Sequence, residues 1–150
     1  MRFNSESGAA VKSGALDPLG RYFAMTSCDG FLSIFAVPQE GEESSTGKLV
    51  KRLKISKLNL KPFGENPFEV AWTPDGASLF TSGDLTLGIL TRDTWELTYS
   101  KEFGHKKAIS CIIWLSDTAF ATAGLDKVIK VWSYAKKSLL YYVTSVNEIV

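Results

Sequence analysis

The chain has 150 residues, of which 45% are hydrophobic and 22% charged, and its formal net charge is +1. This length suits one compact domain that buries roughly 70% of its unfolded surface, and an aromatic content of 12% argues against a disordered or collagen-like chain. Its apolar runs are far shorter than the roughly 18 residues of a membrane-spanning helix. The near-neutral charge also argues against attraction to nucleic acid over the whole surface.

Neither the N-terminus nor the cysteines suggest export. Residues 1–8 lack the apolar stretch of a secretory signal. Cys28 and Cys111 lie far apart with no C-x-x-C spacing, so neither a disulfide framework nor a zinc site is predicted. A reducing compartment fits this cysteine usage best.

In chain order, the first 55 residues contain four apolar segments separated by turns. The third segment follows Asp29 and alternates apolar and small side chains, which is typical of a strand. The segments are Val11 to Pro18, Tyr22 to Thr26, Asp29 to Phe35 and Leu49 to Ile55, with an insert from Pro38 to Lys48 before the last.

The same order of features then occurs twice more. The second unit has segments Phe68 to Pro74, Leu79 to Ser82, Asp84 to Leu90 and Trp95 to Tyr99, and the third has Ala108 to Ser116, Ala119 to Thr122, Asp126 to Trp132 and Ser138 to Val143. The three leading aspartates are 55 and 42 residues apart. The second spacing matches the roughly 40 to 45 residues of a four-stranded propeller blade, and the insert lengthens the first.

These repeats predict an all-β fold with three four-stranded blades, at about residues 10–62, 63–103 and 104–145. A closed propeller needs roughly four to eight blades, so three make an incomplete ring. We therefore expect either that the chain is a piece of a longer protein or that two copies associate into a six-bladed ring.

The third unit reads Gly104-His105, then Ile109 to Trp114, then Thr122 to Asp126, and ends with Ile129 to Trp132. This pattern resembles a WD repeat. The resemblance implies that four side chains form one hydrogen-bonded structural tetrad: His105, Thr122, Asp126 and Trp132. A buried carboxylate is costly unless it accepts several hydrogen bonds, so the tetrad would hold the blade together rather than leave a free titratable group.

The other two units depart from this pattern. Unit one has Met25 at the hydroxyl position and Phe35 at the tryptophan position, and unit two has Leu90 there. We expect Phe35 and Leu90 to support their blades by apolar packing. Trp72, Trp95 and Trp114 also lie in apolar segments and are predicted to pack in the core.

Units one and two contain four short motifs, Asp17-Pro18, Ser27 to Gly30, Ala71 to Pro74 and Arg92 to Trp95. In order and spacing these motifs resemble the N-terminal propeller of the replisome-adaptor family. That family comprises the acidic nucleoplasmic DNA-binding protein of animals and the fungal chromosome transmission fidelity protein. The likeness implies a nuclear, non-enzymatic hub that binds replication-fork proteins. The alternative is a general WD-repeat adaptor, for example in ubiquitin-ligase substrate recognition or ribosome assembly.

Two surfaces are candidates for partner binding. If His105 meets Asp126, their loops share one rim, which would gather Lys106, Lys107 and Lys127, and by repeat position Phe31. The second candidate is a basic strip of Lys48, Lys51, Arg52, Lys54, Lys57 and Lys61, which follows an acidic stretch. These cations either discourage pairing at an edge strand or contact DNA phosphates or an acidic partner.

Catalysis is not predicted. The single histidine is assigned to the tetrad, so a serine or cysteine nucleophile has no evident base. We therefore expect no catalytic residue, cofactor, metal site, small-molecule substrate or membrane contact, and protein partners instead.

Overall fold

The computed structural model describes residues 10–42, 47–54, 69–83 and 85–144. Their regular structure consists of twelve strands in three four-stranded antiparallel sheets. The predicted all-β fold with three four-stranded units is therefore confirmed. Within these ranges, no helix has the length and hydrophobicity that crossing a bilayer requires.

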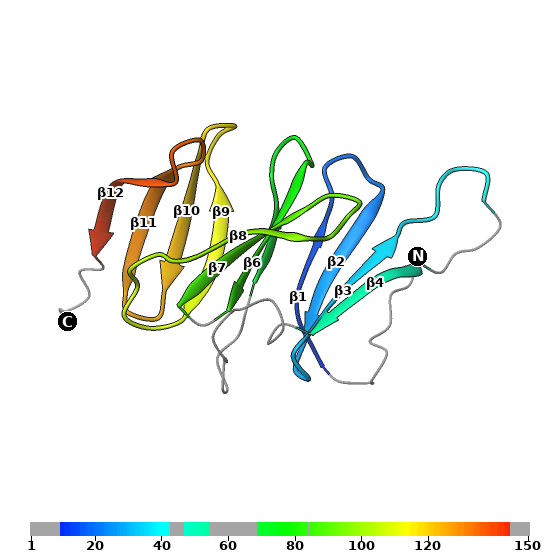
Figure 1. Ribbon diagram of the computed structural model, residues 1–150, viewed down its shortest axis with the longest axis horizontal. Helices are drawn as coiled ribbons and strands as arrows, with labels where there is room; N and C mark the ends of the chain where they lie inside the picture. Colours follow the sequence, from blue (N-terminus) through cyan, green and yellow to red (C-terminus); the bar gives the residue numbers. More distant parts are fainter. Residues whose placement is uncertain (1–9, 43–46, 55–68, 84, 145–150) are drawn as a thin grey trace.

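Each sheet is one blade whose strands follow in chain order. The first blade contains β1 (Val11–Leu16), β2 (Tyr22–Ser27), β3 (Phe31–Ala36) and β4 (Lys48–Lys54). The second contains β5 (Val70–Trp72), β6 (Ser78–Gly83), β7 (Thr86–Thr91) and β8 (Leu97–Glu102), and the third β9 (Ile109–Trp114), β10 (Ala119–Gly124), β11 (Val128–Ser133) and β12 (Ser138–Thr144). The blades stand side by side, with β5 adjacent to both β1 and β9 (Figure 1).

The two ends of the blades carry different sets of turns. We call the end with the β1–β2, β5–β6 and β9–β10 turns the upper rim, which lies at the top in Figure 1. The opposite end, with the β2–β3, β6–β7 and β10–β11 turns, is the lower rim. All candidate sites lie at one of these rims or on the edge strand β4.

Strand register relates equivalent positions in the three blades. One cross-strand row contains Leu16, Phe23 and Phe35 in the first blade, Trp72, Leu79 and Leu90 in the second, and Trp114, Phe120 and Trp132 in the third. In every blade the pairing of the last two strands shifts just before the third residue of this row. The row therefore defines which residues are equivalent by position.

Two apolar cores join the blades. The core between blades one and two contains eight buried residues, Ala24, Leu32, Ile34, Val70, Trp72, Leu79, Leu90 and Trp95. The core between blades two and three is richer in aromatic rings and contains Phe80, Leu87, Ile89, Phe103, Ile109, Ile112, Phe120 and Trp132. Each core thus combines residues from two adjacent sheets, so apolar packing holds neighbouring blades together.

The aromatic and apolar residues predicted to pack in the core are buried except Trp114, which is partly buried against the second core. Phe35 and Leu90 are buried, and Trp72 and Trp95 belong to the first core. Trp95 does not begin a strand, however: it lies in the turn before β8 with φ of 55°. Its amide donates to the carbonyl of Thr91, which closes that turn while the ring remains in the core.

Candidate functional site

The lower rim of the third blade holds a chain of four hydrogen-bonded side chains. Trp132 Nε1 donates to Thr122 Oγ1 at 3.0 Å, and Thr122 Oγ1 lies 2.8 Å from His105 Nε2. His105 Nδ1 lies 3.1 Å from Asp126 Oδ1. One neutral tautomer satisfies every contact: Nδ1–H donates to the carboxylate, and Nε2 accepts from the threonine hydroxyl. The four residues of the predicted tetrad thus lie together.

The carboxylate of Asp126 is held by further donors. The amide of Lys106 donates to Oδ2 at 2.8 Å, and the amide of Val128 donates to Oδ1 at 3.2 Å. Burial by itself raises the pKa of Asp126, but these amides and His105 together lower it below the ordinary value of 3.8. The group is therefore an ionised structural anchor that joins the β8–β9 loop to the β10–β11 turn.

Two threonines at equivalent positions, one inside the tetrad and one in the second blade, allow the contribution of the tetrad hydrogen bonds to stability to be measured. By register, Thr81 in β6 is equivalent to Thr122 in β10, and both are fully buried. Thr81 Oγ1 has no hydrogen-bond partner among the described residues. We expect Thr122→Val to lower the free energy of unfolding by about 1–3 kcal/mol, because it orphans buried polar groups, and Thr81→Val to be neutral or stabilising. Urea unfolding of both variants measures this, and equal losses would contradict the assignment.

The tetrad also predicts how stability depends on pH. Because the pKa of Asp126 is lower in the folded than in the unfolded chain, its contribution is present above about pH 4 and is lost as the pH falls through the folded value. Asp126→Asn should therefore reduce the loss of unfolding free energy between pH 7 and pH 3. Urea unfolding at both pH values tests this, with Glu96→Gln as an exposed control. Equal losses in Asp126→Asn and wild type would contradict it.

The equivalent turn of the first blade is held differently. Asp29 accepts hydrogen bonds from Ser27 Oγ at 2.5 Å and from Arg52 Nη2 at 3.3 Å. The Arg52 guanidinium also lies over the ring of Phe31, 3.6 Å from its centroid. In the second blade, Asp84 lies outside the described residues. The first blade therefore uses an arginine from its outermost strand where the third uses histidine.

The predicted rim residues lie at the same end of the blades but not in one patch of exposed groups. Lys106, Lys107 and Lys127 are exposed around the tetrad, and Lys127 has φ of 67° in the β10–β11 turn. Phe31 begins β3 of the first blade and is only half-exposed beneath Arg52. The third blade thus supplies the lysine group, while Phe31 belongs to a separate blade.

Four of the six residues of the basic strip lie in the described part of the chain. Lys48, Lys51 and Lys54 are exposed on β4, the outermost strand of the first blade. Arg52 pairs with Asp29, so it serves its own blade rather than extending the strip. Lys57 and Lys61 lie outside the described residues. The exposed lysines on β4 fit either the edge-protecting role or an electrostatic contact.

Sequence reasoning missed an ion pair that links two blades at the upper rim. Arg92 Nη2 donates to Asp17 Oδ2 at 2.9 Å, and Nη1 donates to the carbonyl of Gly76 at 3.1 Å. Asp17 also accepts from the amides of Leu19, Arg21 and Tyr22. Burial by itself raises the pKa of Asp17, but Arg92 and the amides lower it overall. The signal was present as Asp17-Pro18 and Arg92-Asp93, although nothing local related the two.

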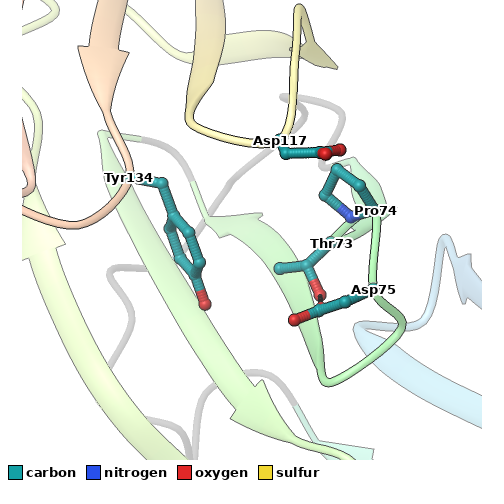
Figure 2. Close-up of a pocket in the computed structure, with 5 residues that line it drawn as sticks. All are labelled: Thr73, Pro74, Asp75, Asp117 and Tyr134. Carbon is teal, nitrogen blue, oxygen red and sulfur yellow. Dashed lines mark hydrogen bonds between the residues drawn. The ribbon is translucent and has the colours of Figure 1, made fainter.

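The upper rim between blades two and three contains a pocket instead of an ion pair. It has a volume of about 270 Å³ and is lined by Thr73, Pro74, Asp75, Asp117 and Tyr134. Figure 2 shows Tyr134 across the opening from Thr73 and Asp75, with Asp117 at the edge beside Pro74. The amide of Ala77 and the hydroxyl of Thr73 donate to Asp75 and lower its pKa, so Asp75 presents a negative charge.

The tetrad, the upper-rim ion pair and the pocket present charged and hydrogen-bonding side chains. The described residues contain no group of three or more histidine, cysteine, aspartate or glutamate side chains suited to a metal ion. Burial and the nearby Glu69 raise the pKa of the Cys111 thiol, which lowers its thiolate fraction and its reactivity. His105 and Asp126 are both engaged within the tetrad.

Parts of this chain are similar to known proteins in sequence and in fold. Residues 96–133 match the family model described as WD domain, G-beta repeat, which covers β8 to β11 and includes the whole tetrad. The chain also matches two solved WD-repeat-type structures at 17% identity over 93% of its length: the RRP9 WD40 repeats, with a TM-score of 0.74, and U3-55K, with a TM-score of 0.70. It covers 40% of each of those chains.

Two curated relatives are fungal proteins. The histone transcription regulator slm9 of Schizosaccharomyces pombe is 26% identical over 81% of this chain, and protein HIR1 of Kluyveromyces lactis is 23% identical over 84% of it. The chain spans 16% and 18% of the length of those proteins. Residues 96–133 therefore match a WD repeat that includes the tetrad, and the described residues fold as three four-stranded sheets like those of the solved WD40 repeats.

Proposed function

We propose that this chain is part of a non-enzymatic nuclear scaffold that binds chromatin-associated proteins. The observation that carries the proposal is the alignment of 81% of the chain with a protein named as a regulator of histone transcription. The WD40 propeller fold is typical of such scaffolds, which hold partners on their rims. The buried polar groups at both rims are engaged in holding blades together, which leaves the exposed rim residues for partners.

A replication-fork role is the narrower form of this proposal. Its support is the resemblance of the short motifs around Asp17 and Arg92 to the replisome-adaptor propeller. The geometry adds one point: Asp17 and Arg92 from two of those motifs form the ion pair between blades one and two. Because Asp17 and Arg92 pair with each other between two blades, this resemblance supports the propeller fold and not a particular partner, and the broader chromatin role is the function we adopt.

We further propose that the three blades, at about residues 10–62, 63–103 and 104–145, belong to a larger ring. In blades one and two, the apolar face turned toward the next blade is covered: Leu32 and Leu87, which by register are equivalent to Ile129 of the third blade, have no exposed surface. On the third blade, the face turned away from blade two leaves Ile113, Ile129 and Tyr141 exposed by 53%, 47% and 56%. A further sheet of the same kind, or a second copy of this chain, would cover them.

Chromatin fractionation of cells that express the full-length protein with an epitope tag tests the function. We expect the protein in the nuclear fraction, released from the insoluble chromatin by nuclease digestion. In synchronised cells, retention throughout the cycle supports the general chromatin role, whereas retention confined to DNA synthesis supports the fork role. An exclusively cytoplasmic protein, or one that nuclease never releases, would contradict both.

A separate experiment tests whether the exposed lysines of β4 contact DNA directly. Titrating a labelled DNA duplex with the 150-residue chain at two salt concentrations measures it, because phosphate contacts weaken steeply as salt rises. A variant with Lys48, Lys51 and Lys54 changed to glutamine should lose any such affinity, while one with Lys106, Lys107 and Lys127 changed should retain it. No binding of the unmodified chain at low salt would leave edge protection as the role of these lysines.

A further inference from the structure

The two blade interfaces differ at one repeated position of the upper rim. Asp17 and Thr73 directly follow Leu16 and Trp72, which belong to the same cross-strand row. Arg92 and Tyr134 likewise stand two residues after Leu90 and Trp132 of that row. The Asp17–Arg92 pair between blades one and two therefore corresponds to Thr73 and Tyr134 between blades two and three.

The first interface shows what occupies this position when it is filled. The guanidinium of Arg92 bonds the Asp17 carboxylate and the Gly76 carbonyl, and it lies over the ring of Tyr22 at 4.7 Å from the centroid. At the second interface no guanidinium of the described residues occupies this position, and the cation beside Tyr134 is the ammonium of Lys137. Tyr134 stands in place of the arginine, and the 270 Å³ pocket opens beside it.

We propose that this pocket binds the side chain of an arginine from a basic segment of a partner protein. The pocket offers what the first interface gives to Arg92: an ionised carboxylate, that of Asp75, directed toward the opening, and an aromatic residue across from it (Figure 2). Asp117 adds a second negative charge at the edge. Planar bidentate recognition of a guanidinium by carboxylate favours arginine over lysine.

One neighbouring cation limits the geometry of binding. Lys137 Nζ lies 4.1 Å from the centroid of the Tyr134 ring and donates to the Tyr134 carbonyl at 2.6 Å. Tyr134 also packs edge-on with Trp114. The incoming guanidinium therefore meets the hydroxyl end of Tyr134 and the Asp75 carboxylate. Two acids, Asp75 and Asp117, line the pocket, whereas the Lys137 ammonium lies beside Tyr134 outside this lining.

This inference deepens the proposed scaffold function and rests on it for the identity of the partner as a protein. Its test uses the 150-residue chain and three capped tripeptides, acetyl-Gly-Arg-Gly-amide and its citrulline and lysine counterparts. Citrulline keeps the size and planarity of arginine but is uncharged. Amide shifts in ¹⁵N-labelled protein should saturate with the arginine peptide, with a dissociation constant on the order of 1 mM, and should map to residues 73–77, 117–118 and 134.

Citrulline and lysine should each bind about tenfold more weakly than arginine. Asp75→Asn should weaken arginine binding by about tenfold, since it removes the charge and retains an oxygen to accept from Ala77 and Thr73. Glu96→Gln removes an exposed acid outside the pocket and should change nothing. The same amide spectra report whether each variant remains folded.

Four results would overturn the proposal: no saturable shift with arginine, equal binding of citrulline, equal binding of lysine, or equal weakening by Glu96→Gln and Asp75→Asn. None of these results depends on whether the protein is retained on nuclear chromatin, so the arginine pocket can be disproved without disproving the proposed function. A chain that leaves chromatin but binds the arginine peptide would retain the pocket and lose the chromatin role.

Discussion

Replacing Arg92 by alanine is expected to lower the free energy of unfolding by about 3 kcal/mol, the lower end of the range for breaking a buried ion pair. The Asp17 side chain has no exposed surface and would lose its cationic partner. Three backbone amides would still donate to it, which keeps the loss at the lower end. Urea unfolding followed by circular dichroism measures the change.

Two variants make this experiment specific. Arg92→Lys should be intermediate, because one ammonium cannot reproduce the two directed bonds to Asp17 and to the Gly76 carbonyl. Arg21→Ala removes an exposed arginine near the same turn and should change stability by less than about 0.5 kcal/mol. A loss for Arg92→Ala no larger than that for Arg21→Ala would show that the pair does not join the blades.

Phe120→Ala is expected to lower the free energy of unfolding by about 3–5 kcal/mol, as large-to-small changes at buried aromatic residues do. Phe120 has no exposed surface, and its ring packs against Phe80 at 5.1 Å and Trp114 at 5.4 Å between centroids. The cavity would lie in the core between blades two and three. Hydrogen exchange should therefore increase in β9–β12 before it increases in β1–β4.

Tyr142 supplies the control for Phe120. It is an aromatic residue of the same blade with 62% of its surface exposed, so Tyr142→Ala should cost less than about 1 kcal/mol. Urea unfolding gives the two free energies side by side. If both variants lost the same stability, or if exchange increased evenly across all strands after Phe120→Ala, the second core would not be the element that docks the third blade.

The strand pattern was predictable from spacing within one blade, and the tetrad from the resemblance of the third unit to a WD repeat. Alternating side chains and turn residues act over a few positions, and they identified twelve strands close to their observed bounds. His105 and Asp126 are 21 residues apart, within one repeat of a known pattern. The exception was Trp95, whose backbone has a left-handed conformation in the turn before β8 while its ring packs in the first core.

What the sequence by itself determined, then, is the composition of each blade, since every blade is built from contacts close in the chain. Only the tertiary structure decided how the blades meet. Asp17 and Arg92 are 75 residues apart, and neither residue type indicates its partner until two sheets are placed against each other. The pocket at Tyr134 likewise exists because two adjacent blades leave a space that the first interface fills with a guanidinium. Contacts between sheets depend on the relative placement of distant segments, and no local periodicity encodes it.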